Sequence, residues 1–316
     1  MQEEALGMDG VYEVRDVGED RVEDLCRLFK TVFEAEITPA AWRWKYQDAA
    51  LLGHVNVVLA EGEQVLGHAG ALILPGVLDG TPVPIAQVCD VMLSPEARGG
   101  AGPRGAYAVF MNGLIGALQA RIPEGMFYGF PGERPFRLGE RLGFYRGTGR
   151  IHDYLRPTAP KGRGLWGASP LGWNDSRLDA LWSRYARRPG CRLVRDRRYL
   201  SWRYERHPGR TYQLLGIRRG LSLAGWVVLN RRDDEILIVD RLIDEAALDR
   251  VLGVVAGWAD TQGARQIAWW QGNLSEHAPA GATARDTGMI GVVMPSSAAR
   301  FAHVSPPWQP GDTDVR

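Results

Sequence analysis

An internal repeat constrains the fold of this chain more than any other feature. Trp44-Lys45-Tyr46 recurs as Trp202-Arg203-Tyr204, 158 residues further along a chain of 316 residues. In both copies a strand-like segment follows, and a glycine, Gly67 or Gly225, stands 23 residues after the tryptophan. The matching order and spacing favour a duplication over chance recurrence of a short aromatic motif. We therefore expect two related domains, each large enough to bury one hydrophobic core.

Composition restricts the class of protein. Hydrophobic residues make up 45% of the chain and charged residues 24%, which is typical of a folded globular protein. The formal net charge of +1 provides no overall field that attracts nucleic acid or an acidic membrane, so neither partner is expected. The first residues, MQEEALGMDG, do not resemble a signal or transit peptide. Because no apolar run approaches the roughly 18 residues of a membrane span, we expect a cytoplasmic protein.

The cysteines indicate neither a metal site nor a disulfide framework. Cys26, Cys89 and Cys191 are odd in number and far apart, and their spacing does not match that of metal ligands. We expect reduced, mostly buried thiols and no bound metal.

Hydrophobic patterns predict an α/β unit in the first copy. The expected elements are a strand at 11–15, helices at 21–34 and 39–48, three strands ending near 92, a helix at 103–119, a strand at 126–130, a short helix at 135–142 and a strand from 144. Residues 156–174 are rich in Pro, Gly and Trp and are expected as a linker, after which a helix at 175–188 begins the second copy. The expected domains are therefore 1–155 and 175–316, and the expected fold class is α/β with a mixed (α+β) sheet.

A glycine-rich turn, Arg98-Gly99-Gly100-Ala101-Gly102-Pro103, lies between a strand ending in Val91-Met92-Leu93 and the long helix. Glycines leave room for a ligand to approach the backbone, and the free N–H groups and dipole of a helix start favour phosphate. Arg98 and Arg104 can add charge-assisted hydrogen bonds. The alternative is an ordinary glycine-rich connection, which the strand–turn–helix–strand context makes less attractive.

The segment from Val91 to Gly100 and the run Leu142-Gly143-Phe144 resemble the GNAT superfamily of N-acetyltransferases. The resemblance covers residues 11–155 well and the second copy in outline. The family's cofactor motif places two small residues either at Ala101 and Pro103 or, with a start at Glu96, at Gly99 and Ala101. The resemblance implies two tandem GNAT-like folds, the second degenerate, and an acyl-coenzyme A co-substrate, in the first instance acetyl-CoA.

By this resemblance the backbone of the strand end pairs with the pantetheine arm, and the pyrophosphate lies over residues 98–104. The implied coenzyme-binding residues are Val91, Met92, Leu93, Arg98, Gly99, Gly100, Ala101, Gly102 and Arg104.

The resemblance also implies a direct attack of an amine on the thioester. The family's usual acid, a tyrosine four residues before the glycine of Leu142-Gly143-Phe144, is Gly139 in this sequence. We expect Tyr128 as its replacement, or departure of the thiolate without help; as a plain alternative, Tyr128 is a core aromatic. Asp90 and Glu133 are the candidate bases. A buried carboxylate is costly unless it is used or paired.

Two further residues bear on the choice of a base. Because Asp240 repeats Asp90 in the second copy, a structural role of Asp90 is the preferred interpretation. His68 is expected as a satisfied strand histidine.

The second copy presents Asp240 to Ala247 where the first has its glycine turn. Carboxylates there would repel a pyrophosphate, so we expect no second coenzyme site. Ten arginines lie between Arg184 and Arg210. They could bind an anionic substrate or nucleic acid, but the preferred interpretation is an ion-paired helix face.

The sequence thus predicts an acyl-CoA-dependent N-acyltransferase that acts on a primary amine of a small molecule, which is anionic if the arginines bind it. Two alternatives remain open: a non-catalytic acyl-CoA sensor or interaction module, and an N-acyl amino acid synthase that uses acyl carrier protein.

Overall fold

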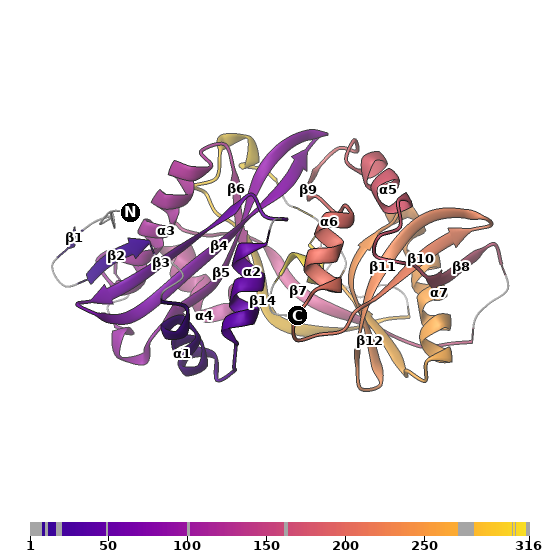
Figure 1. Ribbon diagram of the computed structural model, residues 1–316, viewed down its shortest axis with the longest axis horizontal. Coiled ribbons are helices and arrows are strands. Elements are labelled where there is room, and N and C mark those ends of the chain that lie inside the picture. Colours follow the sequence, from indigo (N-terminus) through magenta and orange to yellow (C-terminus); the bar gives the residue numbers. More distant parts are fainter. Residues whose placement is uncertain are drawn as a thin grey trace. The chain divides into compact units, whose positions relative to one another are not determined.

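The computed structural model describes residues 8–9, 12–16, 21–48, 50–99, 102–160, 164–270, 281–304, 306 and 308–313. The chain divides into two compact units that are not consecutive in sequence. The first comprises Met1–Gly76, Pro82–Thr148 and Ile290–Val304, and the second comprises Val77–Thr81, Gly149–Met289 and Ser305–Arg316. Figure 1 shows their helices and strands.

The first unit contains the elements that the sequence predicts, with small shifts of their ends, and in addition the short strand β1 and a 3-10 turn. They are β1 (Met8–Asp9), β2 (Tyr12–Asp16), α1 (Val22–Phe33), α2 (Pro39–Gln47), β3 (Gly53–Glu61), β4 (Gln64–Leu78), β5 (Thr81–Leu93), a 3-10 turn (Pro95–Ala97), α3 (Ala106–Arg121), β6 (Met126–Gly129), α4 (Glu133–Arg141) and the start of β7 (Arg146–Pro157). Local chemistry explains the start of α2, because the Thr38 hydroxyl accepts a hydrogen bond from the Ala41 N–H at 3.1 Å and Pro39 occupies the first helical position.

The first unit packs helices on both faces of a mixed sheet. Its strands lie in the order β1-β2-β3-β4-β5-β6, followed by the end of β14 (Thr283–Val293). The pair β5–β6 is parallel, whereas β2–β3 and β3–β4 are antiparallel, which confirms the expected α/β class with a mixed sheet. Figure 1 shows α3 and α4 on one face and α1 and α2 on the other.

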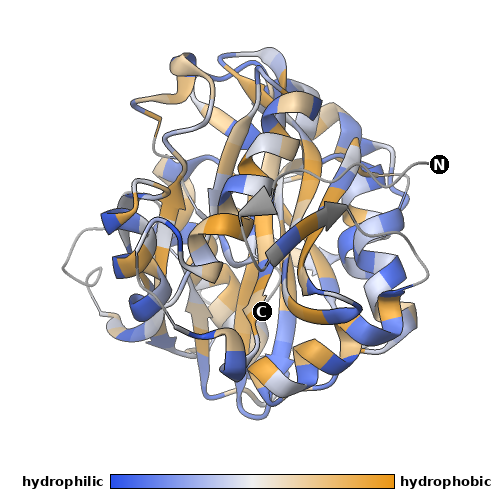
Figure 2. Cartoon of the chain, turned by 90° about the vertical axis from the view of Figure 1, so that its left-hand side faces the viewer, coloured by the Kyte–Doolittle hydropathy of each residue, from blue (hydrophilic) through white to orange (hydrophobic). Residues whose placement is uncertain are grey.

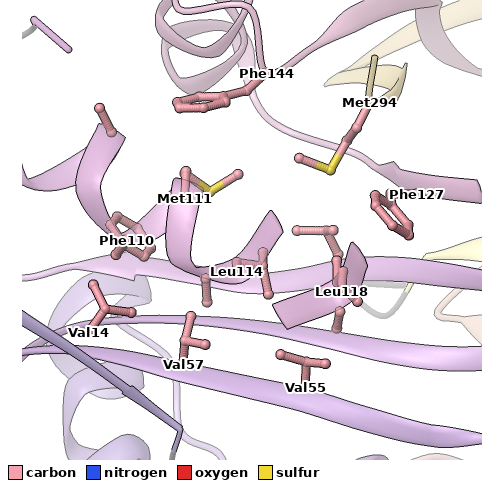
Figure 3. Close-up of a cluster of buried hydrophobic side chains, with 14 of the residues drawn as sticks. Val14, Val55, Val57, Phe110, Met111, Leu114, Leu118, Phe127, Phe144 and Met294 are labelled. Atoms are coloured by element: carbon pink, nitrogen blue, oxygen red, sulfur yellow. The ribbon is translucent and has the colours of Figure 1, made fainter. Parts of the chain in front are cut away.

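The core of the first unit lies between α3 and the sheet. Phe110 and Leu114 of α3 are fully buried above Val55 and Val57 of β3, as Figure 3 shows. Each such large apolar side chain contributes roughly 1.5–3 kcal/mol when it is buried. Asn56, between the two valines, points to the opposite face because strand side chains alternate. Figure 2 shows that the strands are mainly apolar, whereas the helices also carry many hydrophilic residues.

The second unit repeats this architecture. Its elements are the rest of β7, β8 (Trp166–Pro170), α5 (Arg177–Tyr185), β9 (Cys191–Leu193), α6 (Arg197–Leu200) continued by a π-helical turn (Ser201–Glu205), β10 (Gln213–Arg219), β11 (Ser222–Arg232), β12 (Glu235–Leu242), a 3-10 turn (Glu245–Ala247), α7 (Leu248–Thr261), β13 (Gln266–Trp269), the start of β14 and a 3-10 turn at Pro310–Asp312. A further 3-10 turn, Ala299–Phe301, belongs to the first unit. The strand order is β14-β7-β13-β12-β11-β10-β8, with β12 and β13 parallel. Helix α7 packs its buried Val251 and Val255 on Leu215 and Val227.

The strand registers confirm the duplication. Leu59 of β3 pairs with Gly67 of β4, and Ile217 of β10 pairs with Gly225 of β11, so that both partners are displaced by 158 residues. In both hairpins the ladder is interrupted directly after this pair. A shared register with a shared irregularity is a far stricter match than the short aromatic motif.

Each unit is completed by a strand from the other half of the sequence. The end of β14 pairs with β6, with Val292 opposite Gly129, and β7 pairs with β13, with Leu155 opposite Ala268. The division into 1–155, 156–174 and 175–316 that local patterns suggest differs from this arrangement, because strand exchange leaves no local signal. The expected linker also contains β8, which pairs with β10.

Candidate functional site

Strands β5 and β6 run together only briefly and then part. Their parallel ladder begins at Ile85–Met126 and ends at Gln87–Tyr128, whereas β5 continues to Leu93. The backbone of β5 beyond this point leaves the ladder with β6. A strand edge of this kind offers N–H and C=O groups to a further partner.

A buried polar network lies at the point where β5 leaves β6. Asp90 has a left-handed backbone with φ 49°, which is uncommon outside glycine and costs of the order of 1 kcal/mol. Its carboxylate accepts hydrogen bonds from Lys45 Nζ and Tyr46 Oη, both at 2.6 Å, and its backbone oxygen lies 2.9 Å from His68 Nδ1. All four residues are buried. These contacts support the structural interpretation of Asp90, and its role as a base stays a prediction.

His68 makes the stability of this network depend on pH. Burial lowers the pKa of its imidazole from 6.5 to about 4. The folded-state pKa lies below the unfolded one, so the stabilisation is complete above pH 6.5 and is lost as pH falls towards 4. We expect this group to reduce the free energy of unfolding by about 2 kcal/mol between pH 7.5 and pH 5. Urea unfolding of the native chain and of His68→Gln at both pH values measures it. Equal losses in the two proteins would contradict the assignment.

The glycine turn follows β5 and leads into α3. Gly100 and Ala101, two of its residues expected to bind coenzyme, lie outside the described part of the chain. Gly99 and Gly102 are exposed, and a Cβ added at either would meet no heavy atom within 4 Å. The described part of the turn therefore leaves open space beside its backbone.

Two arginines flank this turn. Arg98 donates a hydrogen bond from Nε to the backbone oxygen of Leu93 at 3.0 Å, which ties its side chain to the end of β5. Arg104 is exposed just before α3. Both cations thus stand at the end of the site where an anion is expected.

Helix α3 begins at Ala106, three residues after the expected start at Pro103. The Gly105 N–H closes a turn on the Gly102 oxygen at 3.0 Å, and extended Gly105 is the N-cap. The first-turn N–H groups therefore belong to residues 106–108, none of which is a proline or carries a carboxylate. Because these groups have no partner within the helix, they and the helix dipole suit an anion.

The other catalytic candidates lie on separate elements. Tyr128 of β6 is buried, and its hydroxyl donates to Gln87 Oε1 at 3.5 Å. Phe127 packs in the cluster under α3, so Tyr128 points to the opposite face of the sheet. Glu133 begins α4 and accepts a hydrogen bond from Arg137 Nε at 2.8 Å. The roles of Tyr128 and Glu133 stay predictions.

The space beside Gly139 is filled by a residue that sequence reasoning missed. A Cβ on Gly139, in α4, would lie 2.2 Å from Cδ2 of the Tyr145 ring, so no side chain fits there. The Tyr145 hydroxyl accepts a hydrogen bond from the Tyr107 hydroxyl of α3 at 3.0 Å. The two tyrosines are 38 residues apart, and no local pattern links them.

A sequence model of the GNAT acetyltransferase domain family matches residues 13–147. This part of the chain is therefore similar to the GNAT acetyltransferase domain. The match covers most of the first unit and leaves out its residues 1–12, 148 and 290–304. No sequence among the curated proteins matches the chain.

Solved structures with the same fold span nearly the whole chain. A probable N-acyltransferase from Enterococcus faecalis V583 has a TM-score of 0.66 and 16% identity over 90% of this chain and 72% of that one. A GCN5-related N-acetyltransferase from Anabaena variabilis gives the same values. A tandem GNAT protein from the clavulanic acid biosynthesis pathway has a TM-score of 0.60 and 12% identity over 90% of this chain and 97% of that one. At these identities the likeness establishes the fold alone, which is the expected tandem GNAT fold.

The second GNAT-like unit keeps the buried aspartate of the first. Tyr204 Oη donates to Asp240 Oδ2 at 2.8 Å, as Tyr46 does to Asp90. The partner cation differs, because Arg195 Nε donates to Asp240 Oδ1 at 2.7 Å. A Tyr–Asp pair shared by both units identifies Asp240 as the counterpart of Asp90.

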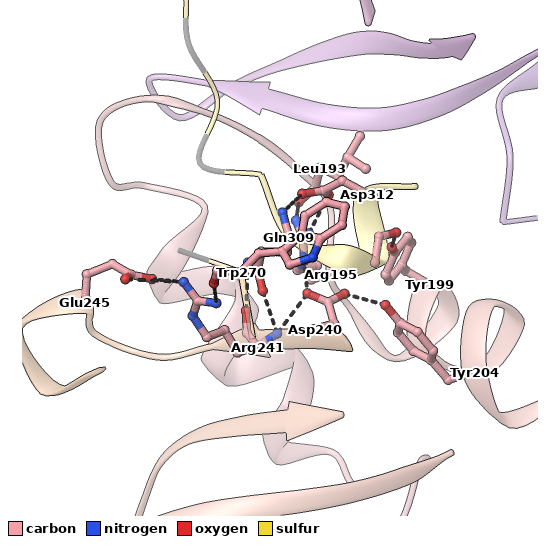
Figure 4. A network of polar contacts seen from close by, with 11 residues as sticks. Leu193, Arg195, Tyr199, Tyr204, Asp240, Arg241, Glu245, Trp270, Gln309 and Asp312 are labelled. Carbon is pink, nitrogen blue, oxygen red and sulfur yellow. Dashed lines mark hydrogen bonds and ion pairs between the residues drawn. The ribbon is translucent and has the colours of Figure 1, made fainter. Parts of the chain in front are cut away.

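In the second unit the backbone of Arg241, the residue after Asp240, forms hydrogen bonds with a side chain of the same chain. The Arg241 N–H donates to Gln309 Oε1 at 2.8 Å, and Gln309 Nε2 donates to the Arg241 backbone oxygen at 3.2 Å. The buried Arg241 guanidinium donates to the Trp270 oxygen at 2.7 Å, just beyond β13, and lies 3.4 Å from Glu245. Figure 4 shows these contacts. Side chains therefore pair with the backbone and fill the place where β12 and β13 part.

The connection from β12 to α7 of the second unit also carries a carboxylate. Asp244 precedes the 3-10 turn before α7, and its side chain accepts a hydrogen bond from the Ala246 N–H at 3.2 Å. The 3-10 turn is followed directly by α7, so this connection lacks the glycine turn that precedes α3 in the first unit.

Several members of the arginine cluster have structural partners. Arg195 binds Asp240 and Asp312, and Arg203 donates to the Thr313 backbone oxygen. Arg197 pairs with Asp179 at 2.6 Å. These contacts agree with the ion-paired interpretation of this part of the cluster.

The described residues contain no group of His, Cys, Asp and Glu side chains with the arrangement of a metal site. Within the same ranges, the helices are too short or too polar to cross a membrane.

Proposed function

We propose that the first unit binds acetyl-CoA or another acyl-CoA and transfers the acyl group directly to a primary amine of a small molecule. GNAT proteins are acyl-CoA-dependent N-acyltransferases as a family, and the chain shares their domain and fold. The donor, the single site and the acceptor class are our proposals for this chain.

The contrast between the two units carries this proposal. Both keep the buried Tyr–Asp pair and the parting strands, but in the second unit a glutamine amide and an arginine pair with the chain at the end of β12, and a carboxylate caps the 3-10 turn that follows. The side-chain amide of Gln309 pairs with both the N–H and the oxygen of Arg241. An amide of the pantetheine arm would pair with the backbone of Val91 in the same way. The first unit keeps glycines and a helix start without a carboxylate at this place.

The residues present fit the coenzyme. The backbone of Val91, Met92 and Leu93 would hold the pantetheine arm, and the turn with the first N–H groups of α3 would hold the pyrophosphate. Arg104 would add an exposed cation. Acyl-CoA supplies the thioester.

Positioning supplies much of the expected rate, because the chain holds an amine beside a fixed thioester. The attacking nitrogen forms a bond to the acyl carbon, the carbon–sulfur bond breaks, and its electron pair leaves on sulfur. The nitrogen releases a proton to water or to the Glu133 carboxylate at the start of α4.

Thiol release from acetyl-CoA over a panel of primary amines tests the activity. We expect amine-dependent release that follows the acyl-CoA concentration to saturation. Saturable binding of acetyl-CoA without thiol release for any amine would favour the acyl-CoA sensor over the enzyme. Release from acyl carrier protein and not from acyl-CoA would replace it by the synthase alternative.

A further inference from the structure

We propose that the second unit binds a nucleoside phosphate on a surface patch of three aromatic rings and two arginines. The residues of the patch are Trp173, His207, Arg210, Tyr212 and Arg232. The rings would stack on the nucleobase, and the arginines would bind the phosphate. This ligand is not the acyl donor, so the proposal does not rest on the proposed function of the first unit.

The three rings of the patch are half-buried and are linked by contacts to the buried ring of Tyr204. Trp173 stacks on Tyr204, with 6.3 Å between the ring centroids and 24° between the planes. Tyr212 meets Tyr204 edge to face at 5.1 Å, and His207 meets Tyr212 at 5.6 Å. Tyr204 is held by its hydrogen bond to Asp240 and is a fixed base for the outer rings. Partly exposed rings of this kind accept a nucleobase by stacking.

Arginines lie close to these rings. Arg203 and Arg210 act on the charge state of His207. The same two arginines and Arg232 act on Tyr212. Burial and then Arg203 and Arg210 lower the pKa of His207 to about 4, so its ring is a neutral stacking surface near neutral pH.

Arg210 is available for an anion. It is exposed, and within the described ranges its side chain forms neither a hydrogen bond nor an ion pair. A guanidinium presents several N–H donors in a plane, which suits the oxygens of a phosphate. The patch therefore combines an anion-binding group with stacking surfaces, as a nucleoside phosphate requires.

The first unit forms the same place without these residues. Its Tyr46 meets His54 edge to face at 5.9 Å, 158 positions before the tyrosine pair of the second unit. Between the paired rings, residues 48–53 read Asp-Ala-Ala-Leu-Leu-Gly, whereas residues 206–211 read Arg-His-Pro-Gly-Arg-Thr. Because the fold forms here with an acid and aliphatic side chains, folding alone does not account for the arginines and the histidine of the second unit.

Calorimetric titration of the full chain with the 5′-monophosphates of adenosine, guanosine, cytidine and uridine tests the proposal. We expect saturable binding of at least one of the four. The parent nucleoside and ribose 5-phosphate, which each offer half of the ligand, should bind at least about tenfold more weakly. Arg210→Ala and Trp173→Leu should each weaken binding of the nucleotide about tenfold. Arg219→Ala is the matched control, because Arg219 is an exposed arginine beside another ring, Trp166, and should bind normally.

Gly102→Glu separates the patch from the coenzyme site, because coenzyme A itself contains an adenine nucleotide. Nucleotide affinity should be unchanged in Gly102→Glu, and acetyl-CoA affinity should be unchanged in Arg210→Ala. Loss of nucleotide binding in Gly102→Glu would place the nucleotide at the glycine turn and overturn the patch. An equal loss in Arg219→Ala and Arg210→Ala would also overturn it. Absence of saturable binding of all four nucleotides up to about 1 mM would refute the proposal and leave the acyl-CoA site standing.

Discussion

Replacing Gly102 by Glu is expected to weaken acetyl-CoA binding at least about 100-fold, or roughly 2.7 kcal/mol. A carboxylate at this position would repel the pyrophosphate and compete for the N–H groups at the start of α3. The fold should survive, because a Cβ at Gly102 meets no heavy atom within 4 Å. Calorimetry measures the affinity, and a melting temperature close to that of the native chain confirms folding.

Two control variants separate charge at the turn from charge elsewhere and from bulk. Gly116→Glu makes the same change at an exposed, open position of α3, ten residues beyond its start, and should bind normally. Gly102→Gln adds nearly the same volume without the charge and should lose much less affinity than Gly102→Glu. If Gly102→Glu binds acetyl-CoA like the native chain, the pyrophosphate lies elsewhere.

Replacing Arg195 by Met is expected to destabilise the second unit by roughly 3–5 kcal/mol. Arg195 donates to Asp240 at 2.7 Å and to Asp312 at 2.5 Å, and all three side chains are buried. Its removal takes away the cation that these two buried carboxylates share. Burial already raises the pKa of Asp312, so the variant should regain part of its stability as pH falls towards 5.

Urea unfolding followed by tryptophan fluorescence measures this loss. Arg198→Met is the matched control, because Arg198 is exposed and lies three residues away; its effect should stay within about 0.5 kcal/mol. A loss below about 1 kcal/mol in Arg195→Met would show that the carboxylates do not depend on this cation.

The repeat and the glycine turn were sufficient to predict the tandem fold, whereas the site that they suggest at the end of β5 stays a prediction. Both are local patterns: a motif at constant spacing, and glycines between a strand and a helix. The start of α3 was predicted three residues early, because a backbone turn between Gly102 and Gly105 precedes the helix. Pro103 alone suggests an earlier start.

Features that depend on contacts between distant residues could not be predicted. Strand exchange places residues 290–304 in the first unit, and no residue pattern records that transfer. Gln309 reaches Arg241 across 68 residues, and Tyr107 reaches Tyr145 across 38. The sequence identified Gly139 as a departure from the family pattern, but only the packing shows that the Tyr145 ring fills its place. The sequence shows that Asp240 repeats Asp90, but it does not show that Lys45 pairs with Asp90 and Arg195 with Asp240.

The number of acetyl-CoA molecules that bind each chain tests the central claim most directly. The first unit has an open turn and helix start, whereas in the second Arg241, Asp244 and Gln309 pair with the chain at the end of β12 and in the turn that follows. Calorimetric titration of the full chain is therefore expected to give one saturable site, which Gly102→Glu removes. Two sites would contradict the closure of the second unit, and the absence of saturable binding would contradict the assignment of the first.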